Sequence, residues 1–293
     1  QAASEKLTDE QIKKLYNLTQ RFRRSKNRGE LWLRLAELYV EKARLVEFKA
    51  QNEYDRQLKL FFEKKRASKP KMDLKLSRQY NVKSIQLYEW FLKDFPRDPK
   101  QDQVLFFLGY NYIEIGEVKK GAGYYRQLTE RFPKSPYVSE SHFALAEYHF
   151  ENDEWKDAYS HYLKVAETKK ARLFAFALYK AAWCQFRLRN TRKAIEFLEV
   201  VIRDSRSAGQ RSGPEGQPEV SRIRLGSEAL KDIVPFYAET GDVEGAKDYF
   251  SRIAANKKEL NELLERLAFV YSDAGTRAAA RHLFRELIDE NPT

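Results

Sequence analysis

The sequence predicts an all-α protein built from repeated pairs of helices. Three observations lead to this prediction. One pattern of small and aromatic residues returns five times along the chain. Sustained alternation of apolar and polar residues, the signature of a half-buried strand, is absent. Glycine is sparse, with 12 residues in a chain of 293, and several glycines stand where a helix has to end.

The repeated pattern is clearest between residues 108 and 133. Leu108 precedes a small residue, Gly109, and an aromatic residue follows three positions after Gly109. A second small residue comes twelve positions after Gly109, and an aromatic or Leu residue four positions after that. Within each copy the apolar residues fall three and four apart, which gives one apolar stripe per helix. The first small position recurs, at intervals of 37, 36, 52 and 34 residues, as Ala146, Ala182, Val234 and Ala268.

The small residues and the turn residues of this pattern each have a structural reason. The two small residues of a copy let the helices of a pair approach closely, so the bulkier Val234 predicts a more open fourth pair. Gly116, Gly241 and Gly275 stand where the first helix must stop, and Gly adopts φ > 0 there without strain. Pro133 closes a second helix because proline cannot continue one. Five copies in nearly one register therefore predict a stack of helical pairs.

The pattern divides the chain into five segments. Thr8 and Gln11 form a capping-box start for a short helix. The chain from Glu41 to Arg66 contains neither Gly nor Pro and breaks only near Pro70. Residues 205–219 are rich in Gly, Pro, Ser and charge. We therefore expect, within one continuous domain, an N-terminal capping helix (1–29), a lengthened helical pair (30–96), three regular pairs (97–204), a flexible loop (205–219) and two further pairs (220–293).

Residues for catalysis or metal binding do not form a recognisable set. The sequence has no phosphate-binding Gly-rich loop and no nucleophile elbow. His142 and His149 lie seven residues apart, without a carboxylate or Cys that completes metal-ligand spacing. The single cysteine, Cys184, stands in an apolar helix and predicts a buried thiol. We expect no enzymatic activity, no cofactor and no metal.

Membrane and targeting segments are not visible in these residues. No stretch approaches the roughly 20 apolar residues that cross a bilayer. The chain begins with Gln, so we expect that it is processed or cut from a longer protein.

The basic charge is concentrated in the first part of the chain. The net charge is +11, and residues 1–80 hold 21 Lys and Arg against 11 Asp and Glu, whereas the remainder holds 33 against 32. Three explanations are open: solvated helix faces, contact with an anionic partner (an acidic protein, an envelope polymer or lipid headgroups), or contact with nucleic acid. No nucleic-acid module signature appears. The candidate basic patch comprises Arg21, Arg23, Arg24, Lys64, Lys65 and Arg66.

A period near 34 residues with this pattern resembles the tetratricopeptide repeat, a helix-turn-helix unit. The resemblance implies a right-handed superhelical solenoid of about six units, whose first helices line a concave inner face that binds ligands. By spacing, the inner positions of the fourth copy are Lys231, Pro235 and Ala238. The earlier copies place aromatic residues there, and we expect these to bind a partner segment unless curvature and the long N-terminal pair bury them as core. They are Phe106, Tyr110, Phe143, Phe150, Tyr179, Trp183 and Phe186.

The amino-acid sequence of the repeats also resembles that of a subgroup of that family over residues 84–170. An aromatic residue followed by proline, as in Phe95-Pro96 and Phe132-Pro133, ends a repeat before a short polar link. Bacterial envelope repeat proteins of the outer-membrane-assembly and Tol-Pal-associated types have similar sequence segments. The resemblance implies a non-enzymatic protein-binding scaffold in a bacterial cell envelope or periplasm. The alternatives are a cytoplasmic adaptor or regulatory domain of a larger protein, and an RNA-binding helical repeat, which would need paired polar inner residues.

Overall fold

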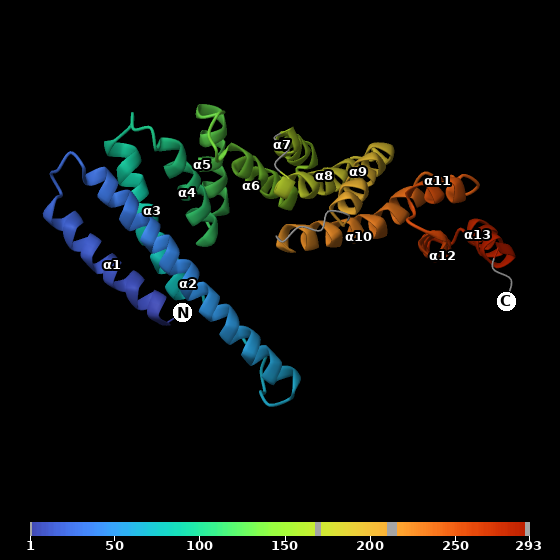
Figure 1. The fold of residues 1–293 in the computed structure, drawn as a ribbon, viewed down its shortest axis with the longest axis horizontal. Helices are drawn as coiled ribbons and strands as arrows, with labels where there is room; N and C mark the ends of the chain where they lie inside the picture. Colours follow the sequence, from blue (N-terminus) through green and yellow to red (C-terminus); the bar gives the residue numbers. More distant parts are fainter. Residues whose placement is uncertain (1, 168–170, 210–215, 291–293) are drawn as a thin grey trace. The chain divides into compact units, whose positions relative to one another are not determined.

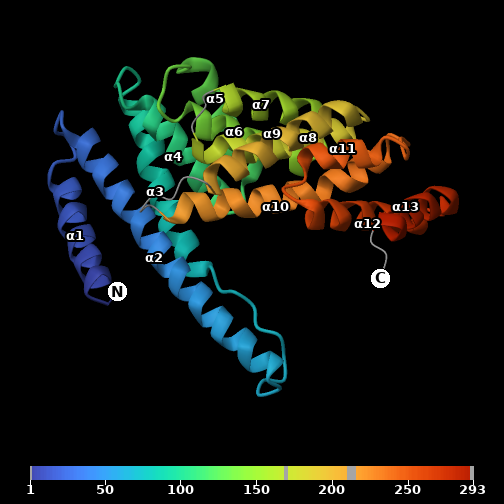
Figure 2. The same cartoon turned by 45° about the vertical axis from the view of Figure 1, so that its right-hand side comes forward.

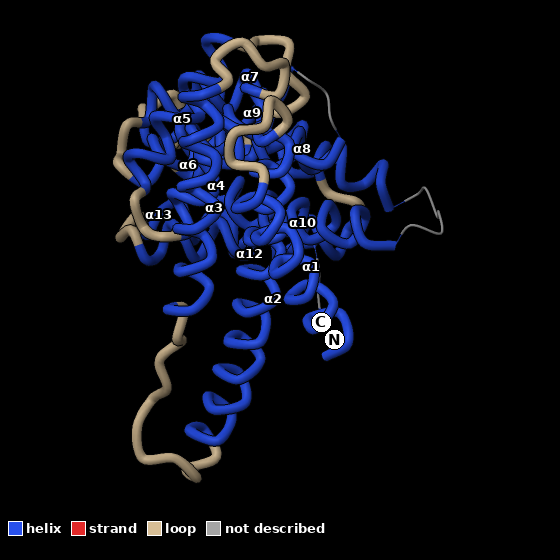
Figure 3. Tube along the Cα trace, turned by 90° about the vertical axis from the view of Figure 1, so that its left-hand side faces the viewer, coloured by secondary structure: helices blue, strands red, loops and turns tan. Residues whose placement is uncertain are grey.

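The computed structural model describes residues 2–167, 171–209 and 216–290 (Figure 1). All regular secondary structure in these ranges is helical, which confirms the predicted all-α class (Figure 3). The helices of the described ranges are α1 (Ala2–Arg21), α2 (Arg28–Phe62), α3 (Lys75–Asp94), α4 (Gln101–Glu114), α5 (Val118–Arg131), α6 (Val138–Glu151), α7 (Trp155–Glu167), α8 (Ala171–Arg187), α9 (Thr191–Gly209), α10 (Gly216–Ala238), α11 (Ala246–Ile253), α12 (Lys257–Asp273) and α13 (Arg277–Glu290).

The chain forms two compact units, the first ending at Ala144 and the second beginning at Leu145. The boundary lies inside α6. Consecutive helices pack as pairs within each unit, with α2 against α3 and α4 against α5 in the first, and with α8 against α9 and α12 against α13 in the second. In the first unit α1 also packs against α2, which places the predicted capping helix on the lengthened pair.

The core of the first unit is built from apolar stripes on α2, α3 and α4. Ala36 on α2 and Tyr88 and Phe91 on α3 are almost completely buried. The Ser84 hydroxyl on α3 donates a 3.1 Å hydrogen bond to the carbonyl oxygen of Ala36. The two helix backbones therefore lie close together at this point, and Tyr39, Tyr88 and Phe91 belong to the same core.

Small residues hold paired helices together in both units. A Cβ atom on Gly121 would lie 2.7 Å from the carbonyl oxygen of Gly109, and one on Gly109 would lie 2.7 Å from the Tyr125 ring. Only glycine fits at position 121, because a backbone oxygen cannot move aside as a flexible side chain can. At the position of Gly121 in two later copies, Ala194 is fully buried and Ala280 is nearly so.

The turns between the helices of a pair have the left-handed residue that the glycines predict. Gly116, Gly241 and Gly275 have φ angles of +89°, +72° and +79°, which confirms the prediction for these three copies. Asp153 and Arg189 occupy the same turn in the second and third copies, with φ angles of 60° and 64°. The turn geometry is thus common to all five copies even where the residue is not glycine.

The helix α2 is much longer than the helices of the regular pairs. It has 35 residues, and its buried residues end at Ala43. The remainder of α2 continues beyond the start of α3, and residues 63–74 return along it to Lys75 (Figure 2). Pro70 is buried within this return. The first pair therefore carries a projecting arm, made of the end of α2 and the returning segment.

The predicted loop at residues 205–219 is shorter in the structure. Helix α9 continues to Gly209 and α10 begins at Gly216, so helix covers both ends of that segment. Residues 210–215 lie outside the described ranges. The helices extend because they pack on each other: Ser205 is buried, and a Cβ atom on Gly226 of α10 would lie 2.1 Å from its hydroxyl oxygen. The composition of the segment could not predict this contact, because its two residues lie far apart in the chain.

The fourth pair differs from the others. Val234 is fully buried, and α10 packs mainly along α9. The contact of α10 with α11 includes the Tyr237 ring, whose centroid lies 4.6 Å from that of Tyr249 and 5.1 Å from that of Phe250. Pro235 lies within α10 and has no backbone N–H to donate.

Enlarging a small buried residue should destabilise the protein. Ala194→Leu and Ala280→Leu are each expected to lower the free energy of unfolding by about 1–3 kcal/mol, because the added atoms overpack the contact between paired helices. Denaturant unfolding monitored by circular dichroism measures this change. The exposed Ala255→Leu serves as a control with little effect. If both buried substitutions are neutral, the repeat register is wrong.

Candidate functional site

Three of the predicted partner-binding residues belong to the first unit and are half-buried. The Phe106 ring centroid lies 4.8 Å from that of Tyr137 and 5.7 Å from that of Tyr125. The Arg44 guanidinium lies 5.0 Å from the centroid of the Tyr110 ring. Phe143 is also half-buried. These rings are neither free surface nor fully buried core.

The other four belong to the second unit, where three of them contact α10. The Tyr179 hydroxyl and the Trp183 indole N–H both donate to Asp232 Oδ2, at 2.6 and 3.0 Å. The Phe186 ring stacks on the fully buried Phe236 ring, with centroids 3.9 Å apart. The structure therefore joins these residues into one cluster held by Asp232 and Phe236. The fourth, Phe150, lies 4.0 Å from the Lys180 ammonium.

Spacing chose different residues of α10 for the inner face from those that contact α8 in the structure. It selected Lys231, Pro235 and Ala238, whereas the side chains that contact α8 are one position further on, at Asp232 and at Phe236. Sequence spacing did not show how α10, which packs along α9, turns toward α8. The idea that all seven residues share one groove stays a prediction, because they are divided between the two units.

A groove on the first unit was not predicted. It has a volume of about 1010 Å³ and lies where α1 and α3 both pack on α2. Aromatic rings line it from all three helices: Tyr16 on α1, Trp32 and Tyr39 on α2, and Trp90 on α3. Tyr16 and Trp90 are 49% and 45% exposed. The Trp32 and Trp90 ring centroids lie 5.7 Å apart, so two large rings meet within the groove.

The charges around this groove are unbalanced. Its two carboxylates are already paired: Asp9 lies 2.7 Å from the Lys42 ammonium, and Asp94 lies 2.8 Å from the Arg28 guanidinium. Lys42 is 4% exposed, and a buried ammonium requires such partners. Among the described residues, none of the four cations that line the groove forms an ion pair; they are Lys13, Arg23, Lys83 and Lys93. The groove is therefore apolar within and positive around its edge.

The six basic residues predicted as one patch lie in two separate places. Arg21, Arg23 and Arg24 are at the end of α1, next to the start of α2, whereas Lys64 to Arg66 follow the end of α2. A helix of 35 residues spans about 52 Å at 1.5 Å per residue. The residues therefore form two clusters at opposite ends of α2 and not the single patch that was predicted, because that helix runs without a break.

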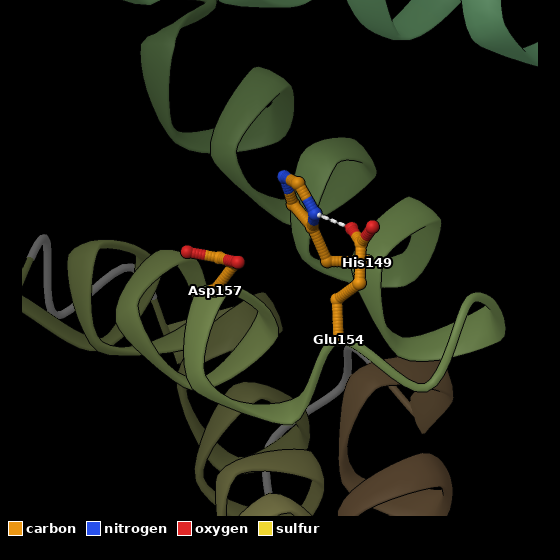
Figure 4. A group of neighbouring side chains, drawn as sticks. All are labelled: His149, Glu154 and Asp157. Atoms are coloured by element: carbon orange, nitrogen blue, oxygen red, sulfur yellow. Dashed lines mark hydrogen bonds and ion pairs between the residues drawn. The ribbon is translucent and has the colours of Figure 1, made fainter.

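One His and carboxylate cluster is present in the described part of the chain. Potential ligand atoms of His149, Glu154 and Asp157 lie within 4.8 Å of one another (Figure 4). Ligands that share a tetrahedral zinc ion lie roughly 3.5 Å apart, and His149 Nδ1 is hydrogen-bonded to Glu154. We interpret the cluster as a contact that stabilises the turn between α6 and α7. The sequence did not reveal this cluster, because Glu154 comes close to His149 only through the turn between the two helices.

The cysteine thiol is not placed for chemistry. Cys184 is fully buried, and burial raises the pKa of its thiol to about 12. The prediction of a buried thiol is confirmed. At neutral pH the group is a neutral, space-filling side chain, since only the thiolate is strongly nucleophilic.

Comparison with known proteins identifies the repeat. Residues 103–135 and 176–206 match the tetratricopeptide repeat family, and these segments correspond to α4–α5 and α8–α9. The helical pairs α4–α5 and α8–α9 are therefore similar to tetratricopeptide repeats. A search of curated proteins finds no match. No helix in the described ranges is long and apolar enough to cross a bilayer.

Solved structures with similar helical repeats share little sequence with this chain. A tetratricopeptide repeat protein from Parabacteroides merdae is 16% identical, with 84% of this chain and 81% of that one covered and a TM-score of 0.43. BtubC from P. vanneervenii is 15% identical, with 72% and 87% covered and a TM-score of 0.44. MamA is 16% identical, with 75% and 95% covered and a TM-score of 0.38.

Proposed function

We propose that this protein is a non-enzymatic scaffold that holds segments of other proteins, and that the groove between α1 and α3 is a binding surface. The observation that carries the proposal is the combination of exposed rings and unpaired cations in one groove. Trp90 and Tyr16 present large apolar area and can still donate hydrogen bonds from their polar ends. Aromatic side chains of this kind contribute most of the binding energy in many interfaces.

The chemistry of the groove favours one class of partner segment. Lys13, Lys83 and Lys93 stand at its edge without a carboxylate partner, so an acidic segment would neutralise them. The interior offers apolar contacts from Leu35, Leu87 and the rings. An amphipathic helix with an apolar face and acidic flanks satisfies both requirements, and helices bind between helices in this way in other proteins.

Selection from a displayed library of random peptides tests the groove. We expect the immobilised chain to enrich peptides that combine apolar residues with Asp and Glu. Trp90→Ser should weaken binding of these peptides tenfold or more, since it removes an anchor ring, and Lys83→Glu with Lys93→Glu should weaken it further by charge repulsion. Phe48→Ser and Lys119→Glu, which are exposed elsewhere on the first unit, are matched controls. Equal binding to all variants would refute the groove.

We also propose the aromatic cluster on α8 as a binding surface of the second unit. Asp232 orients Tyr179 and Trp183 before any partner binds, which lowers the entropy that binding costs. Phe176, three residues before Tyr179 on α8, is 38% exposed. Its ring centroid lies 6.5 Å from that of Tyr179, so it extends the cluster toward solvent.

Two substitutions separate binding from stability at this cluster. Trp183→Ala should lower the free energy of unfolding by on the order of 2 kcal/mol, because Phe236 and Asp232 lose a contact. Phe176→Ser should lower the free energy of unfolding by less than Trp183→Ala does, yet it should weaken the binding of peptides that were selected with the Trp90→Ser variant. Thermal melts and titrations of those peptides measure the two effects. Unchanged peptide affinity for Phe176→Ser would exclude this surface.

We propose a bacterial cell envelope as the location of the scaffold. Support comes from the resemblance of residues 84–170 to envelope repeat proteins, including the aromatic-proline ends at Phe95-Pro96 and Phe132-Pro133. Fractionation of the native organism with an antibody against this chain is the test, and we expect the protein in the periplasmic or membrane fraction. Recovery from the cytoplasm alone would favour the adaptor alternative.

A further inference from the structure

The arm formed by α2 and its returning segment ends in an exposed tip. From Arg44 to Phe62 no residue of α2 is fully buried, a length of about 28 Å at 1.5 Å per residue. The tip, defined here as residues 59–71, is described throughout. All three views show it at the end of a projection from the first unit (Figures 1, 2 and 3).

The tip combines one very exposed ring with many cations. Phe62 is 73% exposed, the largest value among the large apolar side chains of the described residues, and its ring centroid lies 5.8 Å from that of Phe61. Glu63 is the one carboxylate of the segment, and it pairs with Lys65 at 2.8 Å. The cations of the tip are Lys59, Lys64, Lys65, Arg66, Lys69 and Lys71.

We propose that this tip docks on an anionic lipid surface, with Phe62 entering the headgroup region and the lysines contacting lipid phosphates. Each Lys or Arg near an anionic leaflet strengthens binding about fivefold. An aromatic ring is stable at the interface because its apolar body leaves water. The projection of the arm lets the tip reach a flat surface ahead of the rest of the first unit.

The composition of the tip favours lipid over the other anionic partners. Five of its six cations are lysines, which are depleted in protein interfaces, whereas arginine is enriched there. The single arginine, Arg66, is engaged internally, since its Nη1 donates to Gln57 Oε1 at 2.8 Å and its Nε to the Ser68 carbonyl oxygen at 2.9 Å. A nucleic-acid surface would present several exposed rings for base stacking, and Phe62 is the one exposed ring of the tip.

The turn at the tip allows the charge to be removed without loss of the fold. The backbone N–H of Lys65 donates to the Leu60 carbonyl and that of Lys64 to the Phe61 carbonyl, which is the Schellman end of a helix. Lys64 is the left-handed residue of this turn, with φ of 58°. Glycine is the favoured residue at that position, so Lys64→Gly removes a cation while relieving backbone strain.

Co-sedimentation of the whole chain with lipid vesicles tests the proposal. We expect binding to vesicles of phosphatidylcholine with phosphatidylglycerol, little binding to phosphatidylcholine alone, and loss of binding as salt is raised. Phe62→Ser should weaken binding several-fold, and Lys64→Glu with Lys65→Glu tenfold or more. Lys64→Gly should weaken vesicle binding about fivefold while raising the melting temperature. Misfolding cannot produce weaker binding together with a higher melting temperature.

Matched controls come from the same unit. Phe48→Ser removes another exposed ring from α2, and Arg21→Glu with Arg24→Glu gives the same charge change at the opposite end of that helix. Both should bind vesicles as the parent chain does. Absence of binding to anionic vesicles, equal weakening by the control pair, or tighter tip-dependent binding to polyglutamate or to RNA at the same salt would each overturn the lipid assignment.

Discussion

The close approach of paired helices at small residues is the contact on which the other features of each unit depend. At Gly109 and Gly121 the backbones of α4 and α5 are so near that a single methyl group would meet a carbonyl oxygen at 2.7 Å. This separation decides where the larger side chains go. The Tyr125 ring covers Gly109 because there is no side chain below it, and Phe106 then packs against Tyr125. Tyr125 is buried at this contact, whereas Phe106 is half-buried.

Buried polar groups explain why the two candidate binding surfaces differ in charge. In the first unit, Lys42 is buried and draws Glu5 and Asp9 to its ammonium, because an unpaired buried cation is unstable. Carboxylates used in this way cannot neutralise the cations at the edge of the groove. In the second unit, Asp232 instead accepts hydrogen bonds from two aromatic residues of α8. Its charge thereby becomes part of the aromatic cluster. One surface is left positive and the other is not.

The turns show that packing of the pairs dominates local preference. A non-glycine residue in the left-handed region costs about 1–2 kcal/mol, yet Asp153 and Arg189 adopt it where other copies have glycine. Two helices that pack along their length leave one geometry for the turn between them, and the residue there must conform. The same reasoning applies to α9 and α10, whose mutual packing extends helix into a segment that composition marked as a loop.

The sequence by itself determined the class of fold, the repeat register and the burial of Cys184. These features depend on the local periodicity of the apolar residues and on the positions of the small residues, and both can be read directly from the sequence. Only the tertiary structure decided that Asp232 and Phe236 meet α8, that α1 and α3 leave a groove between them, and that the basic residues lie at opposite ends of α2. Each of these depends on the angle and length of packed helices. That information resides in contacts between residues far apart in the chain, which one sequence does not specify locally.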